Sequence, residues 1–272
     1  MMRALYTAAT GMKSEQVNVD TISNNLANVN TVGYKTQRTE FKSLLYQTIQ
    51  TRTTSANGDE KPVSAQVGLG TRVAANTSMY TQGSLTASES DTDFAIEGDG
   101  FFAVRGLDGD VYYTRNGNFT WSLDANGNTF LATQDGYPVL DTQGNAIVVP
   151  EGINAQNMYF SKLGEVGYRD VDGNVTMLNQ QFALYQFTNP NGLEKHSDSL
   201  LEATDASGAP MAETTTAGLV QSKVHQNYLE ASNVSVADEM VNMIIAQRAY
   251  ELNSKAIQTA DSMLDTANNL RR

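Results

Sequence analysis

Residues 235–267 read SVADEMVNMIIAQRAYELNSKAIQTADSMLDTA, and apolar side chains return in this stretch every seven residues. The main stripe consists of Val236, Met243, Tyr250, Ile257 and Leu264. A strict seven-residue repeat is typical of helices that pack in coiled-coil fashion. A second seam holds alanines at 246, 260 and 267, and Asn253 interrupts it. The pattern predicts a long helix over residues 235–270, capped by Ser235, which a partner helix can approach closely.

The other end of the chain shows a second helical pattern, over residues 2–29. Its apolar side chains fall at steps of three and four residues, at Leu5, Ala8, Met12, Val19, Ile22, Leu26 and Val29. Glu15 is the break in this stripe, and Asn30 and Gly33 are stop signals. An amphipathic helix usually faces the core of its own domain. Because neither helix has a sheet beside it in sequence, packing between chains is favoured, with ordinary core packing as the alternative.

Between the helices, residues 81–214 alternate short apolar runs with turn signals, which predicts a domain of short antiparallel strands. Asn116-Gly117 follows one such run and precedes another, and this dipeptide predicts a tight hairpin. The unit Asp-x-x-Gly begins at residues 124, 141, 170 and 205 and predicts four equivalent turns. Calcium loops of similar composition place glycine two positions later and need flanking helices, so turns are the better interpretation.

The predicted fold class is α+β, with discontinuous N- and C-terminal coiled-coil-like helices, an antiparallel all-β middle domain and an irregular connector. The predicted terminal helical domain combines residues 1–35 and 232–272. The connector combines residues 36–80 and 215–231, and it is Thr- and Gly-rich with an exposed loop at 51–64. The outer β-domain spans residues 81–214.

The net charge of −12 is unevenly distributed along the chain. Residues 81–214 contain 19 acidic and 5 basic residues, a net −14, whereas the rest of the chain carries +2. The near-neutral ends can therefore pack against copies of themselves, and the acidic middle favours solubility. Nucleic-acid binding needs a basic face and is disfavoured. The sequence predicts neither a membrane-spanning helix nor a cleaved signal peptide.

The residues that could carry chemistry form no recognisable site. The chain has no cysteine, and His196 and His225 lack the spacing of metal ligands, so neither a metal nor another cofactor is expected. Carboxylates such as Asp91 and Asp93 keep a wall-cutting enzyme open as one alternative. A secreted adhesin is another, although it would give the helices no purpose. The sequence favours a structural protein that is not an enzyme.

Residues 23–35, SNNLANVNTVGYK, are unusual because asparagines sit inside a helical pattern, where they are poor helix formers. The segment resembles the N-terminal signature of the bacterial flagellar axial family, which contains rod, hook and hook-associated proteins. Similar motifs follow in order at 94–104, 113–119, 228–234 and 246–255. The asparagines are interpreted as a polar ladder toward adjacent helices, with a frayed helix end as the alternative. The signature positions are Asn24, Asn25, Leu26, Ala27, Asn28, Thr31, Gly33 and Tyr34.

Within this family, the length and residues 81–85 (TQGSL) most resemble the distal rod proteins, with the longer proximal rod protein as the alternative. The resemblance implies a helical homopolymer that transmits motor torque to the hook. The implied partners are other rod proteins, the hook protein, rod-surrounding ring proteins and the type III export apparatus, without membrane insertion. The implied location is the basal body, across the periplasm, after export without a cleaved signal peptide. The residues expected to pack between subunits are Leu5, Met12, Val19, Ile22, Leu26, Val29, Met243, Tyr250, Ile257 and Leu264.

Overall fold

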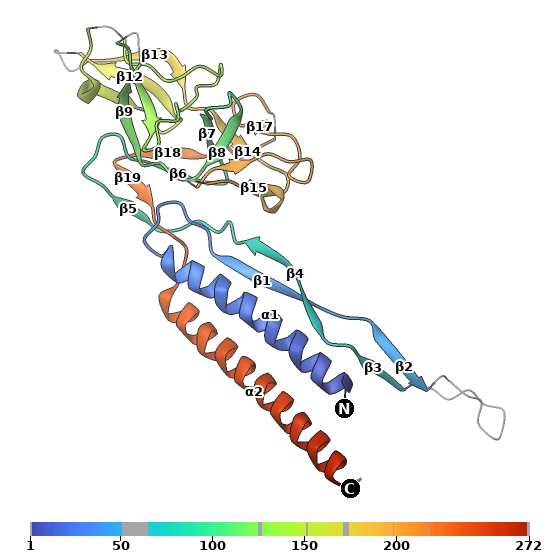
Figure 1. Cartoon of the computed structure of the whole chain (residues 1–272). Helices are drawn as coiled ribbons and strands as arrows, with labels where there is room; N and C mark the ends of the chain where they lie inside the picture. The colour runs from blue at the N-terminus through green and yellow to red at the C-terminus, as the bar shows by residue number, and fades with distance from the viewer. Residues whose placement is uncertain are drawn as a thin grey trace. The chain divides into compact units, whose positions relative to one another are not determined.

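The computed structural model describes residues 2–50, 65–124, 127–150, 152–170, 174–197, 199–216 and 218–270. The loop predicted at 51–64 lies outside these residues. The chain divides into two compact units (Figure 1). The helical unit comprises Met1–Ala27, Gln37–Ser78 and Ser235–Arg272, and the β unit comprises Asn28–Thr36 and Met79–Val234.

Two long helices form the greater part of the helical unit and confirm the helices predicted at the chain ends. Helix α1 spans Met2–Ala27 and helix α2 spans Val236–Asn269. The hydroxyl of Ser235 accepts the backbone N–H of Asp238, so α2 begins at the predicted cap. The helices pack side by side, with the end of α1 against the start of α2, so they run antiparallel (Figure 1).

A two-stranded antiparallel ribbon completes the helical unit. Strand β1 (Gln37–Ser43) pairs with β4 (Thr71–Ser78), and β2 (Tyr46–Gln50) pairs with β3 (Ala65–Gly68). Strands β1 and β4 both contact α1. The prediction of an irregular connector is therefore wrong for the described part of this segment, which forms regular strands. Its Thr- and Val-containing runs suit a strand, and its polar side chains form hydrogen bonds with α1.

The β unit contains the remaining strands, whose pairings are antiparallel as predicted. The largest sheet has the order β15 (Glu194–Lys195), β16 (Leu201–Glu202), β8 (Val111–Thr114), β7 (Phe101–Arg105), β14 (Leu184–Gln186) and β17 (Met211–Ala212). A second sheet has the order β11 (Met158–Phe160), β12 (Glu165–Arg169) and β13 (Val175–Gln181). The remaining pairs are β5 (Leu85–Ala87) with β19 (Tyr228–Glu230), β6 (Phe94–Glu97) with β18 (Lys223–Gln226), and β9 (Phe119–Leu123) with β10 (Thr129–Thr133).

These elements confirm the α+β class with an all-β middle, but the unit boundaries differ from the predicted domains. Residues 215–231 supply β18 and β19, which pair with β6 and β5 inside the β unit. They therefore do not group with residues 37–78, which pack on α1. Residues 28–36 likewise belong to the β unit rather than to the helices.

The core of the β unit lies on both faces of its central strand, β7. Phe102 and Val104 belong to one buried cluster, whereas Phe101 and Ala103 belong to another. Successive side chains of a strand point to opposite faces, so the run FFAV is apolar throughout because both faces are covered. Tyr112 and Tyr113 of β8 divide between the two clusters in the same way. The β unit is thus stabilised by packing on two sides of one sheet.

The Asp-x-x-Gly prediction holds for the turn at residues 141–144. The Gly144 N–H donates to the Asp141 carbonyl at 2.9 Å, and Gly144 has a φ of 81°, which glycine adopts without strain. At the copy that begins at residue 124, the Gly127 N–H donates to the Asp124 carbonyl, and residues 125–126 lie outside the described ranges. The copy at 205–208 forms a different turn, in which the Ser207 N–H donates to the Thr204 carbonyl, and the copy at 170–173 lies partly outside the described residues.

The hairpin predicted at Asn116-Gly117 is wrong. Strand β8 pairs with β7 and β16, while β9 pairs with β10. Gly117 instead lies against the next segment: its carbonyl accepts the Phe94 N–H, and a Cβ at Gly117 would lie 1.7 Å from the Phe94 carbonyl oxygen. Close approach of two backbones, rather than a positive φ, is what requires glycine at this position.

Candidate assembly surface

Among the described residues, three of the four buried apolar side chains of α1 and α2 are alanines. They are Ala8 of α1 and Ala246 and Ala260 of α2, and the fourth is Ile22 of α1. At one point the helices are so close that a Cβ added to Gly11 would lie 2.9 Å from the side-chain nitrogen of Asn253. Asn253, which interrupts the alanine seam, therefore fills the space that Gly11 leaves. Small residues bring the helix axes together but bury little apolar surface.

The contact between α1 and the ribbon is polar. The Thr39 hydroxyl donates to the Thr21 hydroxyl at 2.9 Å, and the Asn76 amide donates to the same oxygen. Nearer the start of α1, the Thr71 hydroxyl donates to that of Ser14. These hydrogen bonds satisfy buried polar groups at modest net stabilisation.

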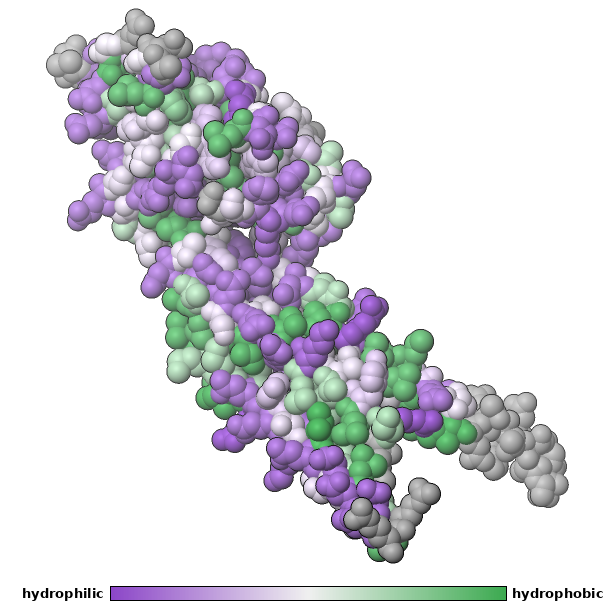
Figure 2. Space-filling model, in the orientation of Figure 1, coloured by the Kyte–Doolittle hydropathy of each residue, from purple (hydrophilic) through white to green (hydrophobic). Residues whose placement is uncertain are grey.

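As a result, the large apolar side chains of the helical unit point outward. On α2 we define the outer apolar face as Met240, Val241, Ile244, Ile245 and Leu252, all exposed. At 100° per residue these positions fall on one side of the helix, opposite the seam that contains Ala246. Figure 2 shows apolar (green) side chains on the visible surface of the helices and of the ribbon. Exposed residues elsewhere in the unit include Met2, Tyr6, Leu45, Tyr46, Ile49 and Met263.

The residues predicted to pack between subunits mostly lie on the other, inner side of each helix. Ile22 is buried within the chain, and Tyr250 is 43% exposed. The others are half-buried: Leu5, Met12, Val19, Leu26, Val29, Met243, Ile257 and Leu264. Whether any of them contacts another subunit stays a prediction. Sequence reasoning missed the outer face, although the doublets Met240-Val241 and Ile244-Ile245, four residues apart, signal a helix that is apolar on two sides.

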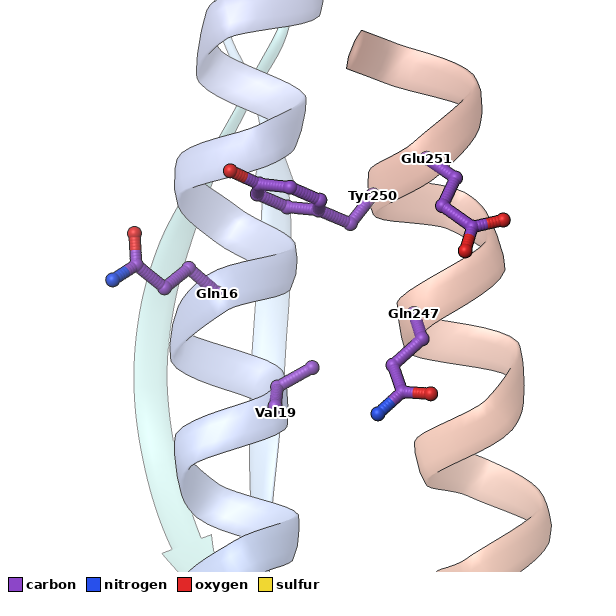
Figure 3. Close-up of a pocket in the computed structure, with 5 residues that line it drawn as sticks. All are labelled: Gln16, Val19, Gln247, Tyr250 and Glu251. Atoms are coloured by element: carbon purple, nitrogen blue, oxygen red, sulfur yellow. The ribbon is translucent and has the colours of Figure 1, made fainter. Parts of the chain in front are cut away.

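A surface hollow of about 420 Å³ opens between the helices and is lined by Gln16, Val19, Gln247, Tyr250 and Glu251. In Figure 3 the Tyr250 ring extends from α2 toward α1, and Val19 points back toward α2. The hollow exists because the small residues of the seam bring the backbones together while larger side chains flank them. It offers an uneven surface on which another side chain could pack.

Asn25, at the end of α1, ties three segments of the helical unit together. Its side-chain oxygen accepts the Gln37 N–H, and its nitrogen donates to the Gln37 carbonyl and, at 3.0 Å, to the Glu239 carboxylate. Asn25 is 1% exposed. The polar ladder to neighbouring helices expected of this residue is therefore wrong, because its amide is fully engaged within the chain.

The signature residues from Asn28 onward lie in the β unit, where the segment around Gly33 meets the motif at 228–234. Gly33, with a φ of 69°, donates its N–H to the Glu230 carbonyl, and a Cβ there would lie 2.7 Å from the Arg115 carbonyl carbon. The Asn233 side chain accepts from the N–H and hydroxyl of Thr36 and donates to the Met79 and Thr81 carbonyls. The two motifs thus bind each other. Thr31 and Asn28 bond through their side chains, while Asn24 and Ala27 are exposed and Tyr34 is half-buried.

A buried ion cluster joins these motifs to the sheets. Glu230 accepts from Lys35 at 2.6 Å and from Arg115 at 3.4 Å, and all three side chains are buried. Burial lowers the pKa of Lys35 and of Arg115, and the charge of Glu230 opposes both shifts. Arg115 also lies over the Phe101 ring at 5.0 Å from its centroid. One carboxylate therefore holds two cations from distant parts of the sequence.

The carboxylates considered for catalysis serve as hydrogen-bond acceptors in the β unit. Asp93 is buried and accepts from the Ser88 hydroxyl, while Asp91 accepts from the Asn227 amide. Within the described ranges, no group of three or more His, Cys, Asp or Glu side chains could hold a metal ion. No helix in the described part of the chain is long and apolar enough to cross a membrane.

Family models of flagellar rod and hook proteins match three parts of the chain, which include most of both terminal helices and part of the β unit. Residues 5–35 match the flagella basal body rod protein model, and residues 95–168 match the flagellar hook protein FlgE/F/G D1 domain. Residues 225–270 match the flagellar basal body rod FlgEFG protein C-terminal model.

Full-length relatives narrow the class. Flagellar basal-body rod protein FlgG of Borreliella burgdorferi is 44% identical over 100% of both chains. The proteins of that name from Caulobacter vibrioides and Bacillus subtilis are 41% and 36% identical, over 99% and 100% of this chain and 100% of their own. The chain therefore belongs to the flagellar basal-body rod protein family, and the predicted resemblance is confirmed.

Proposed function

We propose that this chain is a structural subunit of the distal flagellar rod, which polymerises into a helical shaft and transmits motor torque to the hook. The longer proximal rod protein of the same family is the alternative. The observation that carries the proposal is the outer apolar face of α2, which a single chain leaves in water. Surfaces of this kind mark sites of association. Full-length identity to basal-body rod proteins supports the same role.

In this proposal the terminal segments, 1–35 and 232–272, drive polymerisation, and residues 81–214 form the outer domain. The partners are further copies of the chain, other rod proteins, the hook protein and the ring proteins around the rod. The chain reaches the periplasm through the type III export apparatus. The role is mechanical: many copies resist twisting together, and no covalent bond is made or broken.

Electron microscopy of the concentrated full-length chain tests the proposal, and straight filaments are the expected result. Ile245→Asp places a charge on the outer apolar face, at a side chain that is 61% exposed in one chain. Because the side chain is exposed, the variant should fold normally, yet burying that charge against a neighbour would cost several kcal/mol and abolish filaments.

Leu107→Asp is the matched control, since Leu107 is 92% exposed but lies in the β unit. Filaments of Leu107→Asp and none of Ile245→Asp would support assembly through the helical unit. If Ile245→Asp assembles as well as the unmodified chain, the outer apolar face is not the assembly surface.

A further inference from the structure

The side of α2 that faces α1, called here the inner seam, has a seven-residue repeat, so several positions of α2 along α1 are conceivable. Glu239, Ala246, Asn253 and Ala260 follow one another at intervals of seven residues on the side of α2 that faces α1. Ala246 and Ala260 are equivalent in size and burial. A slip of seven residues, about 10 Å along the helix, would replace one alanine by the other. Alanine packing alone therefore does not select one register.

Two contacts in this seam are not interchangeable. The Asn25 amide donates to the Glu239 carboxylate at 3.0 Å, and Asn253 fills the space at Gly11. On both helices the two contact positions are two heptads apart, so they fit simultaneously in one register. Glu239 is buried, and its bond to Asn25 joins side chains that lie 214 residues apart in sequence.

A slip by one heptad that brings Ala246 opposite Asn25 would remove both contacts. Asn25 would face Ala246, which offers no acceptor, and Glu239 would lose the amide of Asn25. A buried polar group that loses its partner shifts a two-state equilibrium by roughly tenfold or more. A single buried polar pair also fixes register in coiled coils, where apolar seams alone leave it open.

We propose that the Asn25–Glu239 pair, assisted by Gly11 and Asn253, sets the register of α2 against α1. Glu239 is thus a positioning residue. Register decides where along α1 the outer apolar face of α2 is presented, and this consequence rests on the proposed assembly function. The register itself is a property of one chain and can be measured without filaments.

Intrachain cross-linking tests the proposal directly, because the natural chain has no cysteine. Val19→Cys with Gln247→Cys reports the observed register, since both positions line the same hollow. Val19→Cys with Ser254→Cys reports a slip of seven residues. In the full-length chain, a short thiol cross-linker should join the first pair and leave the second at background.

Moving the carboxylate by one heptad, with Glu239→Ala and Ala246→Glu, should reverse this result. Cross-linking of the pair Val19→Cys with Ser254→Cys should rise about tenfold, and cross-linking of the pair Val19→Cys with Gln247→Cys should fall accordingly. The matched control, Asp261→Ala with Ala256→Asp, moves a carboxylate between two exposed positions of α2 that do not line the hollow, and it should leave cross-linking of the first pair unchanged. If cross-linking of the first pair persists after the buried carboxylate is moved, the covalent connections at the helix ends set the register and the proposal is wrong.

A second pair of variants keeps the test decisive if the moved carboxylate unfolds the helices. Glu239→Gln retains an acceptor for Asn25 and should keep the first cross-link, whereas Glu239→Leu should lose at least half of it. Equal cross-linking in these two variants would overturn the proposal. None of these cross-linking measurements depends on filament formation. Failure of the proposed function and failure of the register proposal can therefore be distinguished.

Discussion

Strand β7 of the β unit buries Phe101 and Phe102, whereas helix α2 of the helical unit buries Ala246 and exposes Ile244 and Ile245. Both segments are rich in apolar residues, but β7 buries its large apolar side chains and α2 exposes many of its own. The two hydrophobic clusters of the described chain lie entirely in the β unit. The described buried residues of the helical unit are Ala8, Ser14, Thr21, Ile22, Asn25, Thr39, Ser78, Glu239, Ala246 and Ala260.

This difference indicates what each unit needs in order to be stable. Burying a large apolar side chain contributes about 1.5–3 kcal/mol, and alanine contributes far less. The β unit therefore has a complete core of its own. The helical unit has little core and gains most of its stability only when its outer side chains are covered, as expected of amphipathic helices.

Phe94→Ala should have the largest effect, and it should be confined to the β unit. Phe94 is fully buried and its ring packs against Phe119, Phe160 and Phe182. Removing the ring leaves a cavity and should cost about 3–5 kcal/mol, which thermal unfolding followed by near-ultraviolet circular dichroism would detect. The matched change Ile245→Ala, on the outer apolar face, should stay within about 0.5 kcal/mol. Equal losses would refute the contrast between the units.

Ala246→Leu should have an intermediate effect, confined to the helical unit. Ala246 is 1% exposed where the helices meet, so added methyl groups force them apart at a cost of about 1–3 kcal/mol. Thermal unfolding followed by the helical circular dichroism signal measures this loss. Ala256→Leu, at an exposed position of the same helix, is the control and should leave the signal unchanged. If Ala246→Leu is equally harmless, close helix packing does not stabilise this unit.

The elements that were predictable from sequence are those with a local signature. The heptad from Val236 to Leu264 predicted α2 because apolar residues at helical spacing are a local signal. The apolar run at 101–104 predicted a strand because a short continuous apolar run is the local signal of a buried strand. The direction in which α2 faces was not predictable, because inner alanines and outer isoleucines give two competing apolar sides to one helix.

Long-range polar contacts were also beyond the sequence. Lys35, Arg115 and Glu230 are far apart along the chain, and no spacing links them before the fold brings them together. The motif at 23–35 was recognised as a signature, but its physical role, binding the motif at 228–234, required the structure. The prediction of an irregular connector at the ribbon was wrong because the ribbon packs on polar side chains of α1. Threonine can hydrogen-bond to these side chains, so β1 and β4 contain few of the large apolar residues that usually signal a strand.

The smallest effect tests how completely the core of the β unit excludes water. Burial raises the pKa of Tyr113 to about 12 from an ordinary 10.0. Below pH 10 both the folded and the unfolded chain hold the phenol proton, so the stabilisation is fully present. Between pH 10 and about 12 the unfolded chain releases the proton first, so the free energy of unfolding falls as pH rises.

Tyr113→Phe should therefore change stability little at neutral pH and make it fall less steeply above pH 10. Tyr113 packs edge-on against Tyr185 and Phe187, and phenylalanine preserves those ring contacts. Thermal unfolding at several alkaline pH values, with the tyrosinate absorbance of the two proteins compared, measures both effects. Tyr228→Phe, at an exposed tyrosine, is the control. If Tyr113→Phe leaves the alkaline slope unchanged, water reaches the phenol, and the β unit is less tightly closed than its buried aromatic rings indicate.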